Sequence, residues 1–273
     1  MKRTLFVMLA ALALLGSSVG EPRISDVKAT ACEACGQRIW SYTGSTGPDY
    51  WGSLCAPVCA SGTRQSPIAI VDPQYRALPT ISYHRYSPSP ALRLTNYGFT
   101  PKISYVNNPQ AYIRFSNSSA LYRFGELHFH SPSEHNLDKR LYDMEMHMVH
   151  TDASNANNNV AIAVLIKEGA HNIKFAPILS NLPPNRCQPT PTIPYQNVYD
   201  LLPSDRRYYT YPGSLTTPDC TENVRFVVLN GVIELSRAQI DTFRNYLVTQ
   251  GFQNTNRPLQ DIRGRVVETN VPR

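Results

Sequence analysis

Alternating apolar and polar residues recur in short runs along most of the chain, which is the pattern of half-buried strands. Runs rich in β-branched and aromatic residues, several of them separated by turn residues, span 91–98, 102–107, 111–116, 121–130, 144–150 and 224–235. Residues 160–166 are apolar throughout, as in a strand that is buried on both faces. We therefore predict a mainly β protein of the α+β type, built on a central sheet.

One helix is predicted after the last of these runs. Ser236 is suited to the N-cap, and Gln239 would complete a capping box with it. Gly251 can end the helix. The apolar residues of this segment then fall on one face: Ile240, Phe243 and Leu247.

The first twenty residues have the pattern of a secretory signal peptide. Lys2 and Arg3 precede an apolar stretch at 5–15, and Ser18 and Gly20 are small residues placed for cleavage after Gly20. This stretch is too short to span a membrane, and no later run is apolar enough to do so. We expect a secreted, extracellular and soluble mature chain that begins at residue 21.

Charge and modification sequences add two expectations. Removal of Lys2 and Arg3 lowers the formal net charge from +6 to +4, and no block of Lys or Arg stands out, which argues against nucleic-acid binding. Weak attraction to acidic extracellular matrix polymers stays open. Asn117 begins an Asn-Ser-Ser sequon, so we expect glycosylation there in a secreted protein.

The six cysteines favour disulfides in a secreted chain. The spacings Cys32-x-x-Cys35 and Cys55-x-x-x-Cys59 imitate metal-ligand pairs, but an oxidising compartment makes bridges the better interpretation. Six cysteines allow 15 pairings, and spacing alone does not choose among them. The other two are Cys187 and Cys220.

Residues 126–135, ELHFHSPSEH, place two histidines one residue apart on a predicted strand. Residues i and i+2 of a strand share a face and lie about 6.6–6.8 Å apart, so His128 and His130 point the same way. Two such imidazoles can each reach a zinc ion at about 2.0–2.1 Å. The next strand reads Glu145-Met-His147, which supplies a third histidine. Three histidine ligands leave the fourth zinc position open for water, as in catalytic sites.

Two carboxylates have the same phase as these histidines. Alternation places Glu126 on the face of His128 and His130, and Glu145 on the face of His147. A metal-bound histidine usually donates its other ring N–H to a carboxylate or carbonyl, so both glutamates are candidates for this role.

The local spacing permits a second metal interpretation. A His-x-His pair followed by a glutamate also resembles the metal motif of cupins, which would make Glu134 a ligand in an iron or manganese enzyme. Local spacing alone does not exclude this.

Four separated motifs, in order, resemble α-class carbonic anhydrases: TRQSPIAI (63–70), FGELHFHSPSEH (124–135), MEMHMVH (144–150) and YPGSLTTPDCTE (211–222). The resemblance runs from about Trp40 to Arg265. It implies a large, twisted, mostly antiparallel sheet with peripheral helices and a conical cavity that reaches one zinc ion per chain. The domain would occupy 39–267, after a signal peptide at 1–20 and a Cys-containing extension at 21–38, and before a C-terminal tail at 268–273.

The resemblance also implies roles for single residues. The three histidines named above match the zinc ligands, and the two carboxylates match their hydrogen-bond partners. Thr216 matches the residue that accepts a hydrogen bond from zinc hydroxide and donates one to Glu134, so that Glu134 is not a ligand. The implied substrate pocket consists of Val149, Ala161, Leu215, Thr217, Val224 and Phe226. His135 and His150 match structural histidines, and Ser66 and Tyr211 match their polar surroundings.

Three details of the resemblance bear on chemistry and stability. It implies a disulfide between Cys59 and Cys220, which leaves three possible pairings for the other four cysteines. The family usually has glutamine where Glu126 stands, and the added charge should make the zinc-bound water slightly less acidic. Aligned on Gly98, the position of the proton-shuttle histidine holds Phe99, which cannot carry a proton.

The resemblance implies zinc-dependent, reversible hydration of carbon dioxide to bicarbonate and a proton, with inhibition by sulfonamides. Without a shuttle histidine, proton export should be slow. The alternative is a secreted matrix or binding protein that retained the fold with little or no activity. Residues 53–68 are also similar to the shell-matrix nacreins of molluscs, which keeps a role in biomineralisation open, although the nacrein repeat insert is absent.

Overall fold

The computed structural model describes residues 38–86, 91–106, 110–193 and 197–272. The predicted signal peptide lies outside these residues, and so does the predicted extension at 21–38 except for its last residue, including Cys32 and Cys35. Within the described ranges, none of the helices combines the length and the apolar character that crossing a membrane requires.

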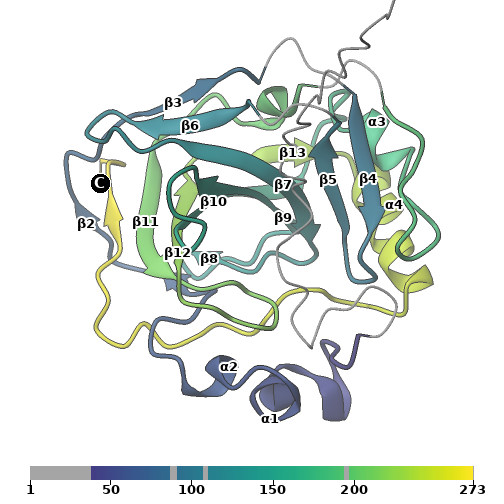
Figure 1. The fold of residues 1–273 in the computed structure, drawn as a ribbon. Coiled ribbons are helices and arrows are strands. Elements are labelled where there is room, and N and C mark those ends of the chain that lie inside the picture. The colour runs from purple at the N-terminus through teal and green to yellow at the C-terminus, as the bar shows by residue number, and fades with distance from the viewer. Residues whose placement is uncertain (1–37, 87–90, 107–109, 194–196, 273) are drawn as a thin grey trace, which may run out of the picture.

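A large mixed sheet organises the described chain (Figure 1). Its main path follows β2 (Gln74–Tyr75), β14 (Glu268–Thr269), β11 (Tyr208–Gly213), β12 (Val224–Leu229), β10 (Asn159–Glu168), β9 (Met144–Asp152), β7 (Tyr122–His130), β5 (Pro101–Tyr105) and β4 (Leu92–Asn96). Three strands lie off this path: β13 (Ile233–Leu235) beside β10, and β6 (Tyr112–Phe115) between β7 and β3 (Ile81–His84). Most neighbours are antiparallel, but β10 is parallel to both β12 and β13, and β14 to β2. The predicted fold class is confirmed.

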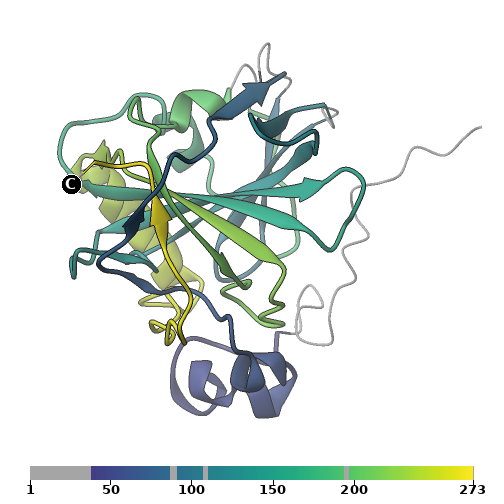
Figure 2. The ribbon, with the colours of Figure 1, turned by 90° about the vertical axis from the view of Figure 1, so that its left-hand side faces the viewer.

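A separate pair of short strands, β1 (Ala69–Ile70) and β8 (Asn136–Leu137), joins the end of the TRQSPIAI motif in parallel to the residues that directly follow FGELHFHSPSEH. The strands of the large sheet cross the molecule with a clear twist, and α1 and α2 lie beyond one end of it (Figure 2).

The helices are short, apart from one. They are α1 (Trp51–Leu54), α2 (Val58–Ser61), α3 (Ala176–Leu179) and α4 (Arg237–Thr249), with 3-10 turns η1 (Gly44–Thr46), η2 (Pro48–Tyr50) and η3 (Val198–Leu201). The predicted capping box of α4 is present between Ser236 and Gln239. The helix ends just before Gly251, whose φ of +88° is in the left-handed region that favours glycine. Phe243 of α4 packs against Phe129 of β7 at 5.7 Å, so α4 covers one face of the sheet.

Strand alternation divides the buried side chains between two cores. On β10, Val160, Ile162 and Val164 belong to the larger core, whereas Ala161 and Ala163 belong to a smaller core on the opposite face. The expectation that this strand is buried on both faces is confirmed. The methionines of β9 and the phenylalanines of β7 also face the larger core, as does His150, which leaves His128, His130 and His147 on the other face.

Two boundaries differ from the sequence expectation. The run at 224–235 forms two strands, β12 and β13, because the chain turns at Asn230-Gly231 and only the second part moves beside the far end of β10. The expected C-terminal tail contains β14, whose residues pair with β11 and β2, so the sheet continues past the expected domain end at residue 267.

Candidate metal centre

Three histidines from two neighbouring strands converge on one face of the sheet. In the antiparallel ladder of β7 and β9, His128 lies directly opposite His147, and His130 lies two residues along β7. The three ring centroids lie 4.8–5.3 Å apart. One ligand atom from each ring falls within 4.8 Å of the others. The face predicted by strand alternation is therefore the one on which the rings meet.

Each of these rings has one nitrogen held by the protein. His128 Nδ1 lies 3.0 Å from both carboxylate oxygens of Glu126, and His147 Nε2 lies 2.7 Å from Glu145 Oε1. His130 Nδ1 lies 2.6 Å from the carbonyl oxygen of Thr255. An acceptor at one nitrogen fixes the N–H there and leaves the lone pair on the other nitrogen, as in metal-bound histidines.

The remaining nitrogen of His130 supports a cation site directly. His130 Nε2 is buried and has no hydrogen-bond partner, which is costly unless something else satisfies it. Burial, together with the neighbouring His147 and His128, holds the pKa of His130 well below its usual value, so its lone pair is available. Three neutral imidazoles suit zinc and other borderline divalent metals, so the residues fit such an ion.

The two carboxylates behind the rings are held in the ionised form. Burial alone would raise the pKa of Glu145, but His135 and His147 outweigh it, and the pKa falls well below its usual value. Glu145 Oε2 also accepts the backbone N–H groups of Glu134 and His135, at 2.8 and 2.7 Å. For Glu126, burial is likewise outweighed, mainly by His128 with a contribution from Lys102, and its pKa is lowered.

A second cluster of possible ligand atoms, from His135, Glu145 and His147, is a hydrogen-bonded group. Glu145 Oε1 lies 2.6 Å from His135 Nδ1 and 2.7 Å from His147 Nε2, so these atoms already satisfy one another. His135 Nε2 in turn lies 2.6 Å from the Tyr211 hydroxyl, which lies 3.0 Å from Ser66 Oγ. This chain of contacts stabilises the position of the His147 ring.

Glu134 lies beside the metal centre and is anchored at its other oxygen. Glu134 Oε1 accepts the backbone N–H of Arg257 at 2.9 Å, while Oε2 lies 3.4 Å from His130 Nε2 and 3.9 Å from His147 Nδ1. Burial raises the pKa of Glu134 to about 7, against the opposing effects of His147 and of hydrogen bonds that include one from Thr216. Thr216 therefore contacts Glu134, as the resemblance implied.

Comparison with known proteins agrees with this geometry. The model of the eukaryotic-type carbonic anhydrase family matches residues 46–271. A carbonic anhydrase from Nostoc sp. is 32% identical, with 97% of this chain and 96% of the relative covered. Bovine carbonic anhydrase 6 is 34% identical, with 86% of this chain and 81% of the relative covered.

The chain belongs to the α-class carbonic anhydrases.

Solved structures share the fold. The α-carbonic anhydrase of Thermovibrio ammonificans, in complex with the inhibitor sulfanilamide, is 34% identical with a TM-score of 0.76, and the match covers 84% of this chain and 98% of that one. A hyperthermostable carbonic anhydrase from an active hydrothermal vent chimney is 37% identical, also with a TM-score of 0.76, over 84% of this chain and 99% of the other. The chain is accordingly an enzyme of the reversible hydration of carbon dioxide, and the cupin interpretation is wrong.

The predicted substrate pocket of this carbonic anhydrase lies on the histidine face. The strand register places Val149, Ala161 and Phe226 in one row across β9, β10 and β12. Val224 lies two residues from Phe226 on the same face, and Leu215 packs against the same small core. Thr217 lies in the same loop as Thr216, and its carbonyl accepts the Cys220 N–H.

The loop that carries Thr216 is held by the segment at 64–66, which explains the TRQSP motif. Ser66 and Ser214 exchange two hydrogen bonds between backbone N–H and side-chain oxygen, at 2.9 and 3.1 Å. Gln65 donates to the carbonyl of Cys220 and to Glu222. The predicted disulfide between Cys59 and Cys220 is confirmed and ties the same loop to α2. Cys55 and Cys187 are also disulfide-bonded.

Sequence reasoning missed two residues of the site from the C-terminal segment. Arg257 is buried, and its guanidinium donates to Gln65 Oε1 and to the carbonyls of Ser66 and Cys59, while its backbone holds Glu134. Burial lowers the pKa of this guanidinium to about 10. The Thr255 carbonyl orients His130. In the sequence, this segment was marked only by lying within the range of the resemblance, which did not reveal these contacts.

Phe99 is buried in an aromatic cluster. Only 3% of the residue is exposed, and its ring centroid lies 5.0 Å from Trp40 and 6.3 Å from Tyr42. The two histidines without an assigned role lie elsewhere: His84 on β3 stacks on Tyr112, and His171 is exposed in the loop after β10.

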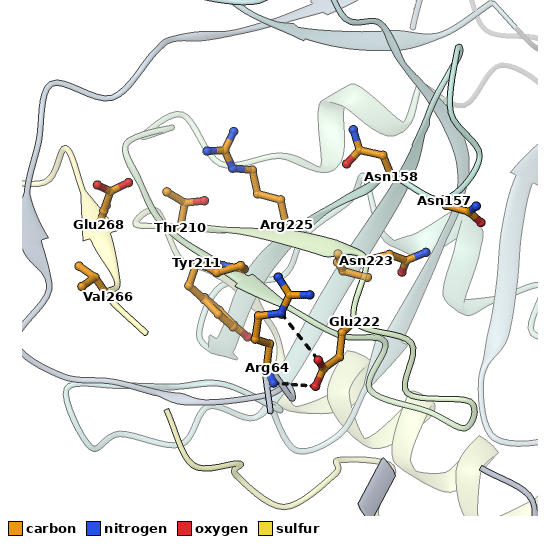
Figure 3. A pocket seen from close by; sticks show the side chains of 13 residues that line it. Arg64, Asn157, Asn158, Thr210, Tyr211, Glu222, Asn223, Arg225, Val266 and Glu268 are labelled. Carbon is orange, nitrogen blue, oxygen red and sulfur yellow. Dashed lines mark hydrogen bonds and ion pairs between the residues drawn. The ribbon is translucent and has the colours of Figure 1, made fainter. Parts of the chain in front are cut away.

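A cavity of about 460 Å³ lies at the end of β11 and β12, lined by Arg64, Glu222, Asn223, Arg225 and Glu268 among others (Figure 3). Arg64 pairs with Glu222 there. Val224 contributes to its lining, but none of the three convergent histidines does, so this cavity is separate from the candidate metal centre.

Proposed function

We propose that this chain is a secreted, zinc-dependent carbonic anhydrase in which His128, His130 and His147 bind the metal. The observation that carries the proposal is the arrangement of their nitrogens: in each ring one is held by an acceptor of the protein and the other faces the shared point. A zinc ion bound there would act as a Lewis acid and lower the pKa of a water molecule to about 7, which is the established behaviour of this family.

In this proposal, the residues around the ion orient the reacting groups. The Thr216 hydroxyl donates to Glu134 and therefore presents its oxygen as an acceptor toward the site, which selects one orientation of the nucleophile. Glu134 serves as an acceptor rather than a ligand, because its Oε1 is already anchored by the Arg257 N–H. A cation beside Glu134 would favour the ionised form that this role requires.

The pocket on the histidine face would hold carbon dioxide by apolar contact. Val149, Ala161, Val224 and Phe226 offer no hydrogen-bonding side chains, so a linear, uncharged substrate loses little by displacing water from them. Ala161 leaves more room than a valine would.

Three further parts of the proposal concern proton transfer and location. With Phe99 at the shuttle position, buffer molecules would carry the proton away. The predicted signal peptide and the disulfides support secretion, because disulfides persist in oxidising compartments. Asn117 is exposed in the turn after β6, which is compatible with glycosylation there.

Metal analysis combined with carbon dioxide hydration tests the proposal. We expect one zinc per chain, and hydration that an aryl sulfonamide abolishes. A His130→Ala variant should lose both the metal and the activity, whereas His171→Ala, at an exposed site, should retain both. A folded protein with zinc bound and no hydration would favour the matrix or binding alternative, and a protein that binds no zinc would refute the ligand set.

A further inference from the structure

Two cations lie on the histidine face where the sheet becomes accessible to solvent. Strand alternation places Leu92, Leu94 and Ile103 in the larger core. Arg93, between the two leucines on β4, and Lys102, directly before Ile103 on β5, therefore point to the opposite face, which is that of the histidines.

The strand register places Lys102 beside the metal centre. Ile103 of β5 pairs with Leu127 of β7, and the strands are antiparallel. Lys102 therefore lies across from His128, and Ser104 lies across from Glu126. Arg93 pairs with Ser104 on β4, so it is a diagonal neighbour of Lys102, at roughly 7–8 Å.

This part of the face is open, in contrast to the sealed part around Phe226. Arg93 is exposed and makes no ion pair among the described residues, and Lys102 is partly buried with Nζ 4.6 Å above the Tyr97 ring. Val149 and His128 are also partly exposed. The wall from β4 to β9 is thus accessible over the region through which a ligand would approach the histidines.

The balance of charge on this wall is positive. Glu126 is the one partly exposed carboxylate that β4, β5, β7 and β9 carry on this face within the described residues, and both of its oxygens face His128 Nδ1. Glu134 and Glu145 are buried and have hydrogen-bond donors of their own. Arg93 and Lys102 therefore outnumber the accessible acidic groups.

We propose that Arg93 and Lys102 form an anion-binding edge of the cavity, which holds bicarbonate and other carboxylate-bearing ligands beside the metal centre. The proposal rests on the function proposed above, because it needs a ligand seated at the histidines. The two positive charges add no electrostatic binding free energy for an uncharged ligand. They attract an anion, although solvent screens part of this attraction.

Three sulfonamides of similar size test this edge without relying on catalysis. Benzenesulfonamide is neutral beyond its zinc-binding group, whereas 4-carboxybenzenesulfonamide and 4-(aminomethyl)benzenesulfonamide carry a negative and a positive charge. Calorimetry with the zinc-loaded protein at low salt gives each dissociation constant. We expect Lys102→Met to weaken the carboxylated ligand about three- to tenfold relative to the neutral one, and Lys102→Glu to weaken it more.

The other measurements separate charge from structure. Arg93→Met should also weaken binding of the carboxylated ligand relative to the neutral one, but by a smaller factor. Lys102→Glu should strengthen binding of the ammonium ligand. Lys174→Met is the matched control, because it removes an exposed lysine next to Phe175, which packs on the larger core. In each case added salt should reduce the differences, since it screens exposed charges.

The outcomes are distinguishable. An affinity ratio between the carboxylated and neutral ligands that stays within twofold in both Lys102→Met and Lys102→Glu, with unchanged thermal unfolding, would refute the anion-binding edge and leave the proposed function intact. If the wild-type protein loaded with zinc binds none of the three sulfonamides, the proposed function itself fails, and the edge with it.

Discussion

Five of the histidines in and around β7 and β9 form two groups that differ in one respect. His135 and His150 have a partner at both ring nitrogens: His135 contacts Glu145 and Tyr211, and His150 contacts the Met148 carbonyl and the Tyr86 hydroxyl. Each ring of the other group has a hydrogen-bond partner in the protein at one nitrogen only; this group consists of His128, His130 and His147. Glu134 Oε2 lies near two of their free nitrogens, at 3.4 and 3.9 Å, and makes no hydrogen bond to either. The difference separates histidines that stabilise the fold from those that can hold an ion, and it is invisible in the spacing of the sequence.

The largest effect should come from breaking the open group. His128→Ala removes one of three ligands, so we expect the metal content to fall well below one per chain. Hydration should fall by at least about a hundredfold, beyond the 10- to 100-fold typical of changes behind a ligand. Atomic absorption and stopped-flow hydration measure the two. A variant that retains full zinc and activity would show that the open nitrogens do not define the site.

The closed group should respond to pH instead. Burial lowers the pKa of His150 to about 4 from about 6.5, although hydrogen bonds to the carbonyls of Met148 and Val160 oppose this shift. Between these values the unfolded chain binds a proton that the folded chain does not. Stability is therefore fully present above about pH 6.5 and falls as the pH drops toward 4, by up to about 3 kcal/mol.

Denaturant titrations of the wild type and of His150→Gln across this range isolate the contribution. The slope of unfolding free energy against pH should be shallower in the variant, because glutamine does not titrate. Equal slopes would show that folding does not shift the pKa of His150.

A smaller effect should follow from weakening the connection between the two groups. Glu145 contacts both His135 and His147, so Glu145→Gln keeps the shape but removes the charge that both rings face. We expect zinc affinity to fall about 10- to 100-fold, as measured by competition with a chelator. Glu168→Gln, at an exposed carboxylate paired with Arg237, is the control and should leave affinity unchanged.

The smallest change concerns histidines outside both groups. The shuttle position holds Phe99, which is buried against Trp40 and has no proton to transfer. The two unassigned histidines, His84 on β3 and His171 in the loop after β10, lie away from the metal centre, so we expect neither imidazole to export protons. Added imidazole buffer should therefore raise kcat severalfold and leave kcat/KM nearly unchanged. Turnover that does not depend on buffer would reveal a proton carrier within the protein.

Local periodicity was enough to predict much of the fold and the metal centre. Alternation along β7 and β9 placed the three histidines and two glutamates on one face, because a strand has a strict period of two. The capping box of α4 was equally local. The prediction of a single strand at 224–235 was wrong. Apolar residues on both sides of Asn230-Gly231 masked a turn, after which the chain forms a second strand beside β10.

The contacts that complete the site come from segments distant in sequence. The Thr255 carbonyl on His130 and the Arg257 N–H on Glu134 are backbone groups, and a backbone group leaves no trace in residue type. Lys102 showed its place only when the pairing of Ile103 with Leu127 was known. The family resemblance supplied Thr216 and the Cys59–Cys220 bridge, which spacing could not.

The direct opposition of His128 and His147 across β7 and β9 has a practical consequence. A slip of one residue between these strands would turn one ring to the other side of the sheet, and the ion would lose its binding site. Zinc retained through purification would thus serve as an assay of correct strand alignment, and a preparation could be sorted into properly aligned and misaligned molecules by its metal content.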